Sequence, residues 1–155
     1  MQIHFKQYLL ANGLGFATAI LITILAVAGG NRSDPMPVFE QGITPNEVDL
    51  NKTQTISLHW KRVVLRRCDS ATTGRLTDSR GLLHYYAPVI NKFSEIDEKN
   101  IHKIVDYSRE MNLPEILVPG KVKLDISVEY YCNWTNRIWP IKIERNPTYF
   151  EVVRQ

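Results

Sequence analysis

Motifs for catalysis and for metal binding are missing from this chain of 155 residues. No glycine-rich phosphate loop follows a predicted strand, no nucleophile elbow occurs, and neither an H-x-x-x-H nor a C-x-x-C spacing is present. The carboxylates are spread evenly along the sequence. Because no motif favours an enzyme, we expect a non-enzymatic protein that holds no metal and no cofactor.

A strong excess of charge of one sign is missing as well. The chain has 19 Lys and Arg against 16 Asp and Glu, and residues 31–155 carry 18 of those bases and all 16 acids. Proteins that bind nucleic acid usually present a clustered basic face, so we expect no nucleic-acid partner. One local basic group consists of Lys61, Arg62, Arg66 and Arg67. It fits a solvated strand edge better than a contact with acidic lipid headgroups.

Cysteine is scarce, with only Cys68 and Cys132. In a β domain outside the cytoplasm two cysteines usually form a disulfide. Closing a loop of about 65 residues would stabilise the fold by roughly 3–4 kcal/mol. The alternative is two free thiols on inward faces, since cysteine is among the most buried residue types. We favour the disulfide.

Charge is absent from residues 7–31. Roughly 20 apolar residues in this run would form a helix that crosses about 30 Å of hydrocarbon with every backbone polar group satisfied. We therefore predict a tail over residues 1–8, a single-pass transmembrane (signal-anchor) helix over 9–30 and a linker over 31–36. The side chains expected to contact the lipid bilayer are Leu9, Leu14, Phe16, Ile20, Ile22, Ile24 and Leu25.

A cleaved signal peptide is the alternative for the same segment. Lys6 would supply its positive start, and Ala26-Val27-Ala28 before Gly29 fits a small-x-small cleavage pattern near Ala28. Both interpretations place the rest of the chain on the non-cytoplasmic side, since the basic excess precedes the apolar run. Gly15 and Ala19 have a spacing that permits close packing of two helices, so self-association stays open.

Period-2 alternation dominates the rest of the chain. Every even position from 122 to 132 is apolar, aromatic or Cys, which predicts a strand with one buried face. Residues 53–68 alternate in the same way, with Ile56, Leu58 and Trp60 on the buried face and a bulge near 62–66. Further strands are predicted over 36–43 (an edge), 82–90, 138–144 and 148–153, with a loop or hairpin over 69–81.

One helix is predicted among these strands, over residues 94–112. Ser94-Glu95-Ile96-Asp97 resembles a capping box, and Ile101, Ile104, Val105 and Met111 fall near one face at helical spacing. The alternative is a loop with one helical turn. Because strands dominate without βαβ alternation, we predict a mainly β, antiparallel sandwich over residues 37–155 with one inserted helix.

The end of the chain resembles the closing strands of immunoglobulin-like sandwiches. Tyr130 stands two residues before Cys132, as in the tyrosine corner of that fold, and Cys68 lies at a plausible interval for the bridging partner. The pattern departs from antibody domains because no Trp follows Cys68 within a strand's length; the nearest one, Trp60, precedes it. The resemblance implies a divergent immunoglobulin-like module.

The layout is also similar to short phage-encoded proteins that place one N-terminal helix before such a domain. Their last strands read as a Pro-Gly turn, an alternating strand and a Phe-x-Val ending, matched here by Pro119-Gly120 and by Phe150 with Val152. This resemblance implies a viral protein associated with a membrane or a virion, with a virion or envelope protein as its partner and no catalytic residue.

Aromatic side chains near the C-terminus are the candidates for contact with a protein partner. Trp134 is expected at the tip of a loop over 133–137, followed by Arg137 and Trp139. Exposed Trp and Arg are common interface anchors, although aromatics more often pack within hairpins. The sequence favours a membrane-anchored structural or interaction protein. A secreted binding or adhesion module is the alternative, and an enzyme at a membrane would need a pocket with converging polar groups.

Overall fold

A computed structural model describes residues 13, 15–24, 26, 32–94 and 98–154 of the chain. The chain divides into an N-terminal unit over residues 1–33 and a β unit that begins at Asp34. The expected linker over 31–36 therefore contributes to the β unit, since Pro35 and Met36 are buried in its core.

Residues 15–24 of the N-terminal unit are helical. Phe16, Ile20, Ile22 and Ile24 are exposed on this helix, whereas Leu9, Leu14 and Leu25 lie outside the described residues. The hydroxyl of Thr23 donates to the backbone carbonyl of Ala19 at 2.9 Å. Among the described residues, no helix combines the length and the apolar character that crossing a bilayer requires.

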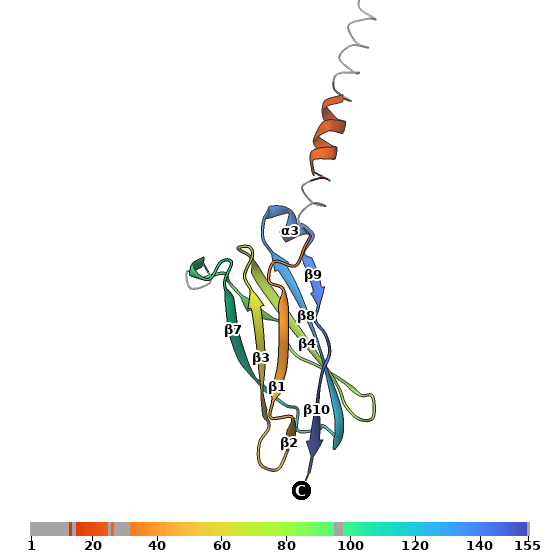
Figure 1. Cartoon of the computed structure of the whole chain (residues 1–155). Coiled ribbons are helices and arrows are strands. Elements are labelled where there is room, and N and C mark those ends of the chain that lie inside the picture. Colours follow the sequence, from red (N-terminus) through yellow and green to blue (C-terminus); the bar gives the residue numbers. More distant parts are fainter. Residues whose placement is uncertain (1–12, 14, 25, 27–31, 95–97, 155) are drawn as a thin grey trace, which may run out of the picture. The chain divides into compact units, whose positions relative to one another are not determined.

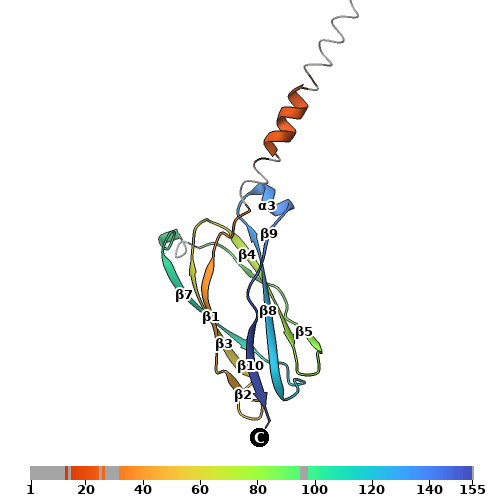
Figure 2. The same ribbon diagram turned by 45° about the vertical axis from the view of Figure 1, so that its right-hand side comes forward.

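The β unit consists of two sheets that face each other (Figures 1 and 2). The first sheet has the order β1(Val38–Thr44)-β3(Thr55–Val63)-β7(Ile104–Asn112). The main path of the second is β2(Glu47–Asp49)-β10(Thr148–Val153)-β8(Gly120–Tyr131)-β4(Asp69–Thr77)-β5(Leu83–Tyr85). In addition, β6(Val89–Asn91) pairs with β4 and β9(Ile141–Glu144) pairs with β8. The pairing is antiparallel except between β2 and β10, which confirms a mainly β sandwich.

The core lies between the two sheets and follows the predicted alternation. On β3, Ile56 and Leu58 are fully buried, while His59 on the opposite face is exposed. On β8, all inward positions are buried, and their neighbours are at least partly exposed. The inward residues of β8 are Val122, Leu124, Ile126, Val128 and Tyr130. The strands predicted over 122–132 and 148–153 are confirmed, and the one predicted over 53–68 is confirmed as β3, which ends at Val63.

The helix predicted over 94–112 is wrong, because its second half is strand β7. Val105, Tyr107, Arg109 and Met111 alternate with exposed residues, and β7 pairs with β3 in unbroken register from Ile104 to Asn112. The helix prediction rests on the spacing of four apolar residues: Ile101, Ile104, Val105 and Met111. Pairing with β3 nevertheless makes residues 104–112 a strand. Residues 95–97 of the proposed capping box lie outside the described residues.

Of the loop or hairpin predicted over 69–81, the loop is wrong over 69–77, whereas the turn that follows joins β4 to β5 as an antiparallel hairpin. Strand β4 runs through the middle of the second sheet and pairs with β8 along its whole length. Its composition is polar because Ser70, Thr72 and Gly74 face the space between the sheets without filling it. A Cβ at Gly74 would stand 3.4 Å from Cδ2 of Tyr86, so the glycine lets that ring pack closely.

A short helix, α3(Trp134–Ile138), replaces the loop predicted over 133–137. Asn133 is its N-cap, and its side-chain oxygen accepts from the backbone N–H of Asn136 at 2.9 Å. Such a cap satisfies a donor that a helix start otherwise leaves open. Ile138 therefore belongs to α3, and the strand predicted over 138–144 begins only after Pro140, at β9.

Candidate functional site

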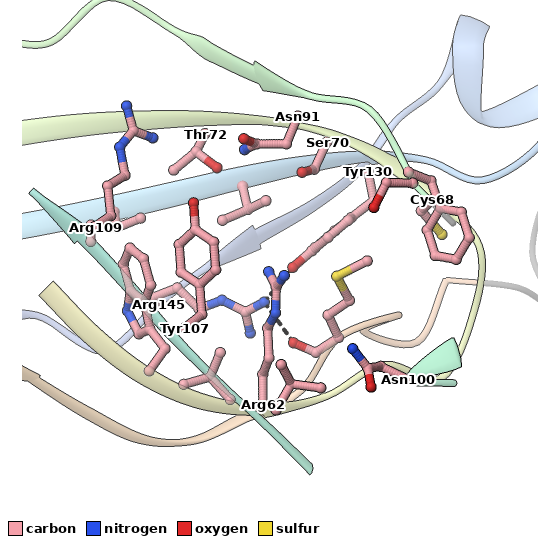
Figure 3. A pocket seen from close by; sticks show the side chains of 18 of the residues that line it. Arg62, Cys68, Ser70, Thr72, Asn91, Asn100, Tyr107, Arg109, Tyr130 and Arg145 are labelled. Carbon is pink, nitrogen blue, oxygen red and sulfur yellow. Dashed lines mark hydrogen bonds between the residues drawn. The ribbon is translucent and has the colours of Figure 1, made fainter. Parts of the chain in front are cut away.

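A cavity opens between the two sheets (Figure 3). Its volume is about 400 Å³. Its walls come from the inward faces of β3 and β7 on one side and of β4 and β8 on the other. Three arginines are among its lining residues: Arg62, Arg109 and Arg145. Because charged groups rarely face the inside of a sandwich, these side chains define the candidate site.

Arg145 carries the best-satisfied charge of the site. Its guanidinium forms an ion pair with Asp34 and donates to the carbonyl of Met36 at 3.0 Å and to the hydroxyl of Tyr130 at 2.6 Å. Only 9% of the Arg145 side chain is exposed. This network fastens the start of the β unit to the connection between β9 and β10, since Asp34 and Met36 belong to one and Arg145 to the other.

Tyr130, which faces inward near the end of β8, belongs to the same hydrogen-bond network. Burial raises the pKa of its phenol, and the positive charges of Arg145 and Arg62 oppose that shift. The hydroxyl therefore stays protonated at neutral pH and accepts the hydrogen bond from Arg145. This use of Tyr130 differs from a tyrosine corner, in which the hydroxyl bonds to a backbone group upstream.

Arg62 faces the same cavity from β3 without a comparable partner. Its Nε atom is buried, and within the described part of the chain nothing forms a hydrogen bond with it. Its guanidinium carbon lies 4.8 Å from the centroid of the Tyr107 ring, in cation–π contact. Tyr107 in turn stacks on Trp60 at a centroid distance of 5.4 Å. The ring stack thus covers one face of the guanidinium, while the buried Nε–H has no acceptor within the described part of the chain.

Carboxylates do not neutralise this surplus of positive charge. Among the described residues, neither Arg62 nor Arg109 has an acidic group within ion-pairing distance. Asp106 borders the cavity, but it is exposed on the outer face of β7. There Glu40, and to a smaller extent Asp106, raise the pKa of Lys61. The inside of the site thus has three guanidinium groups and one carboxylate, that of Asp34.

Hydroxyl groups and apolar side chains complete the walls. Ser70 and Thr72 project from β4 (Figure 3). Ile126 and Val128 on β8 also line the cavity. Phe93, which follows β6, closes another side. A site with cationic donors, hydroxyls and apolar walls suits a molecule with an anionic head and an apolar body.

The disulfide favoured by the sequence is present between Cys68 and Cys132. It joins the residue before β4 to the residue after β8, which are neighbouring strands of one sheet. Cys68 is buried and lines the cavity. The bridge therefore closes the end of the second sheet beside the site, whereas the bridge of immunoglobulin domains crosses between sheets.

The predicted contact residues Trp134, Arg137 and Trp139 lie on or next to α3, at the end of the β unit near the disulfide. The exposed fractions are 63% for Trp134, 80% for Ile138 and 61% for Trp139, and Arg137 is also exposed. Thr135 and Asn136 are buried, so they hold the inner side of the helix. We call Trp134, Arg137, Ile138 and Trp139 the α3 patch; the sequence analysis missed only Ile138.

Sequence reasoning missed most of the cavity. Arg62 was assigned to a solvated basic group, and Arg109, Arg145, Tyr107 and Asp34 were not singled out. A signal was present for Arg62, because it has the same parity as Ile56, Leu58 and Trp60. For Arg109 the wrong helix assignment hid its inward position. The pairing of Asp34 with Arg145 spans most of the chain, and no local pattern indicates it.

Metal-binding groups are not part of this site. Among the described residues, no group of three or more His, Cys, Asp and Glu side chains converges in a way that could hold a metal ion.

Comparisons with known proteins do not assign the chain to a family. No family model matches the chain, and no curated protein matches it. Among solved structures, the chain is similar to the alkylpurine DNA glycosylase AlkC of Pseudomonas fluorescens bound to DNA with an abasic site analog. The TM-score is 0.45 and the identity 11%, covering 83% of this chain and 33% of the glycosylase chain. This chain thus spans about a third of that protein's length.

A second similar structure is a Bordetella pertussis protein described as ApaA. The TM-score is 0.45 and the identity 9%, with 77% of this chain and 95% of that chain covered. Likenesses this weak have no bearing on function.

Proposed function

We propose that the protein is a non-enzymatic structural or interaction module, held at a membrane by residues 9–30, with its β unit on the non-cytoplasmic side. The observation that carries this proposal is the absence of charge over residues 7–31 directly before a disulfide-bonded β unit. A run of that length suits the hydrocarbon core of a bilayer. A disulfide persists where the surroundings are oxidising, which supports a location outside the cytoplasm.

The α3 patch is the surface that we propose for a protein partner. It presents two Trp rings, an Ile and an Arg from a rigid, capped turn of helix. Trp and Arg are enriched among the residues that dominate binding energy at interfaces. Large exposed apolar side chains that gather in one place usually mark a contact site. If the chain is viral, a virion or envelope protein is the partner.

An immunoglobulin-like assignment of the sandwich is the finer part of the proposal. It is supported by two facing antiparallel sheets and by the long alternating strand β8 that ends at Tyr130 and Tyr131. The bridge within one sheet and the bond from Arg145 to the Tyr130 hydroxyl set it apart from antibody domains. Capsid or tail genes beside the gene for this chain would support the phage-like origin.

Fractionation of cells that make the full chain tests the anchor. We expect the protein in the membrane fraction after carbonate washing, with Met1 at its N-terminus. The variant Ile22→Lys should release much of it, because a charge in mid-bilayer is costly. The control Thr53→Lys changes an exposed position of the β unit and should stay in the membrane fraction.

The same fractionation separates the alternatives. A mature protein that begins at Gly29 and appears in the medium or periplasm would establish the secreted binding module. A soluble chain with Met1 intact would refute both.

A further inference from the structure

We propose that the cavity between the sheets binds a small amphiphilic anion, with a carboxylate or phosphate head held by Arg62 and an apolar body lying against the walls. This inference concerns the β unit alone and goes beyond the proposed function.

The charge balance inside the sandwich points to an anion. Arg145 is neutralised by Asp34, but Arg62 and Arg109 have no acidic partner among the described residues. Arg62 and Arg145 both lie close enough to Tyr130 to act on its phenol, so this region holds two guanidinium groups and one carboxylate, which Arg145 uses. Because an uncompensated charge between sheets is costly, an anion that enters the cavity is favoured there.

The geometry of Arg62 fits bidentate recognition of such a head group. Tyr107 covers one face of its guanidinium at 4.8 Å, while the buried Nε atom has no partner among the described residues. Figure 3 shows the side chain reaching from β3 into the cavity. The planar fork of an arginine matches the two oxygens of a carboxylate or phosphate, and a ring stacked on its face leaves those donors free.

The walls specify the rest of the ligand. Trp60, Phe93, Val105, Ile126 and Val128 give the cavity apolar surfaces on both sheets. A volume of about 400 Å³ lies within the range of small-ligand sites. Asn91 and Lys92 border the cavity and are exposed, so they give access from solvent and Lys92 adds a positive charge at the rim. A bare inorganic anion would leave the apolar walls without a contact.

Calorimetric titration of the full chain, kept in lipid nanodiscs with empty nanodiscs subtracted, tests the inference. The probes are hexanoate, hexyl phosphate, 1-hexanol and inorganic phosphate. We expect at least one of the two amphiphilic anions to bind at least tenfold more tightly than 1-hexanol and inorganic phosphate. Which of the two anions binds identifies the head group.

The variant Arg62→Met assigns the site. It should weaken binding of the anion at least tenfold and should not lower the melting temperature of the protein without ligand, because it removes an uncompensated charge. The matched control is Arg75→Met, on the outer face of β4 where Arg75 pairs with Asp125 at 3.0 Å; it should leave binding unchanged. Equal binding of hexanol and hexanoate, no binding of either anion, or unchanged binding by Arg62→Met would each overturn the proposal. None of these results depends on where fractionation places the chain.

Discussion

The arginines that face the inside of the β unit are of two kinds: those whose charge is paired with a carboxylate and those whose charge is not. Arg145 belongs to the first kind, since Asp34, Tyr130 and the Met36 carbonyl use its donors. Arg62 belongs to the second, with an aromatic ring on one face and a buried Nε atom that lacks a partner among the described residues. The same residue type therefore has a structural role at one position and a proposed binding role at the other.

Removing Asp34 should destabilise the β unit substantially. In Asp34→Ala the Arg145 guanidinium stays buried without its counter-charge, and we expect a loss of roughly 2–4 kcal/mol in the free energy of unfolding. The value is below that of a fully buried pair, because 21% of the Asp34 side chain is exposed. Urea unfolding followed by tryptophan fluorescence measures it.

The double variant Asp34→Leu with Arg145→Met is the control for that experiment. It removes both charges and should recover a large part of the stability. If the double variant is as unstable as the single one, packing rather than charge is what the pair supplies.

Tyr86 should titrate late. Burial raises the pKa of its phenol from 10.0 to about 12, and the hydroxyl donates to the carbonyl of Asn112 at 2.8 Å. A raised pKa means that the protonated form stabilises the fold, so this contribution is complete below pH ~10 and is lost as the pH rises toward 12. Phenolate absorbance across that range measures it. Tyr86→Phe should remove one phenol's share of the late transition, because the pKa of Tyr130 is raised as well. Ionisation of Tyr86 near pH 10 would contradict the assignment.

Among the secondary-structure elements, α3 shows most directly how one polar side chain positions a surface. The Asn133 side chain accepts from the N–H of Asn136 and from the hydroxyl of Thr135, at 2.9 and 2.6 Å. These bonds keep Thr135 and Asn136 on the inner side. As a result, Trp134 and Ile138 project outward.

Asn133→Ala should therefore cost about 1 kcal/mol of stability and disorder the α3 patch. Asn133→Asp keeps an acceptor at the cap and should behave like the unchanged protein. Hydrogen exchange at the Asn136 amide reports the cap locally, and urea unfolding reports the whole β unit. If Ala and Asp have the same effect, the cap does not hold α3.

A strand could be predicted from the sequence where its own residues alternate between apolar and polar. It could not be predicted where pairing with neighbouring strands determines the secondary structure. Strand β8 shows its buried face in the sequence alone, and β3 does so over most of its length. Strand β7 fits both a helical and a strand period, so only its register with β3 selects one. Strand β4 looks like a loop because its inward side chains, Ser70 and Thr72, line a cavity instead of filling a core. The cavity itself needs all four strands in place, and no segment predicts it alone.

For the whole β unit, the disulfide covalently joins two positions that are 64 residues apart along the chain. Replacing both in Cys68→Ala with Cys132→Ala should lower the free energy of unfolding by roughly 3–4 kcal/mol, because the unfolded chain regains the freedom that the loop removes. Unfolding of the unchanged protein with and without a thiol reductant should give a comparable difference. A reductant without effect on the midpoint would indicate free thiols.

If residues 9–30 anchor the chain as proposed, the pairing of Asp34 with Arg145 has a mechanical consequence. Tension from the N-terminal segment enters the β unit at Asp34 and passes through Arg145 to Tyr130, whose neighbour along β8 leads through Cys132 to α3. While the ion pair holds, it takes part of the load before Val38, so less of it reaches the pairing of β1 with β3. A force between Asp34 and the α3 patch would thus run through Arg145, Tyr130 and Cys132 at one end of the sandwich.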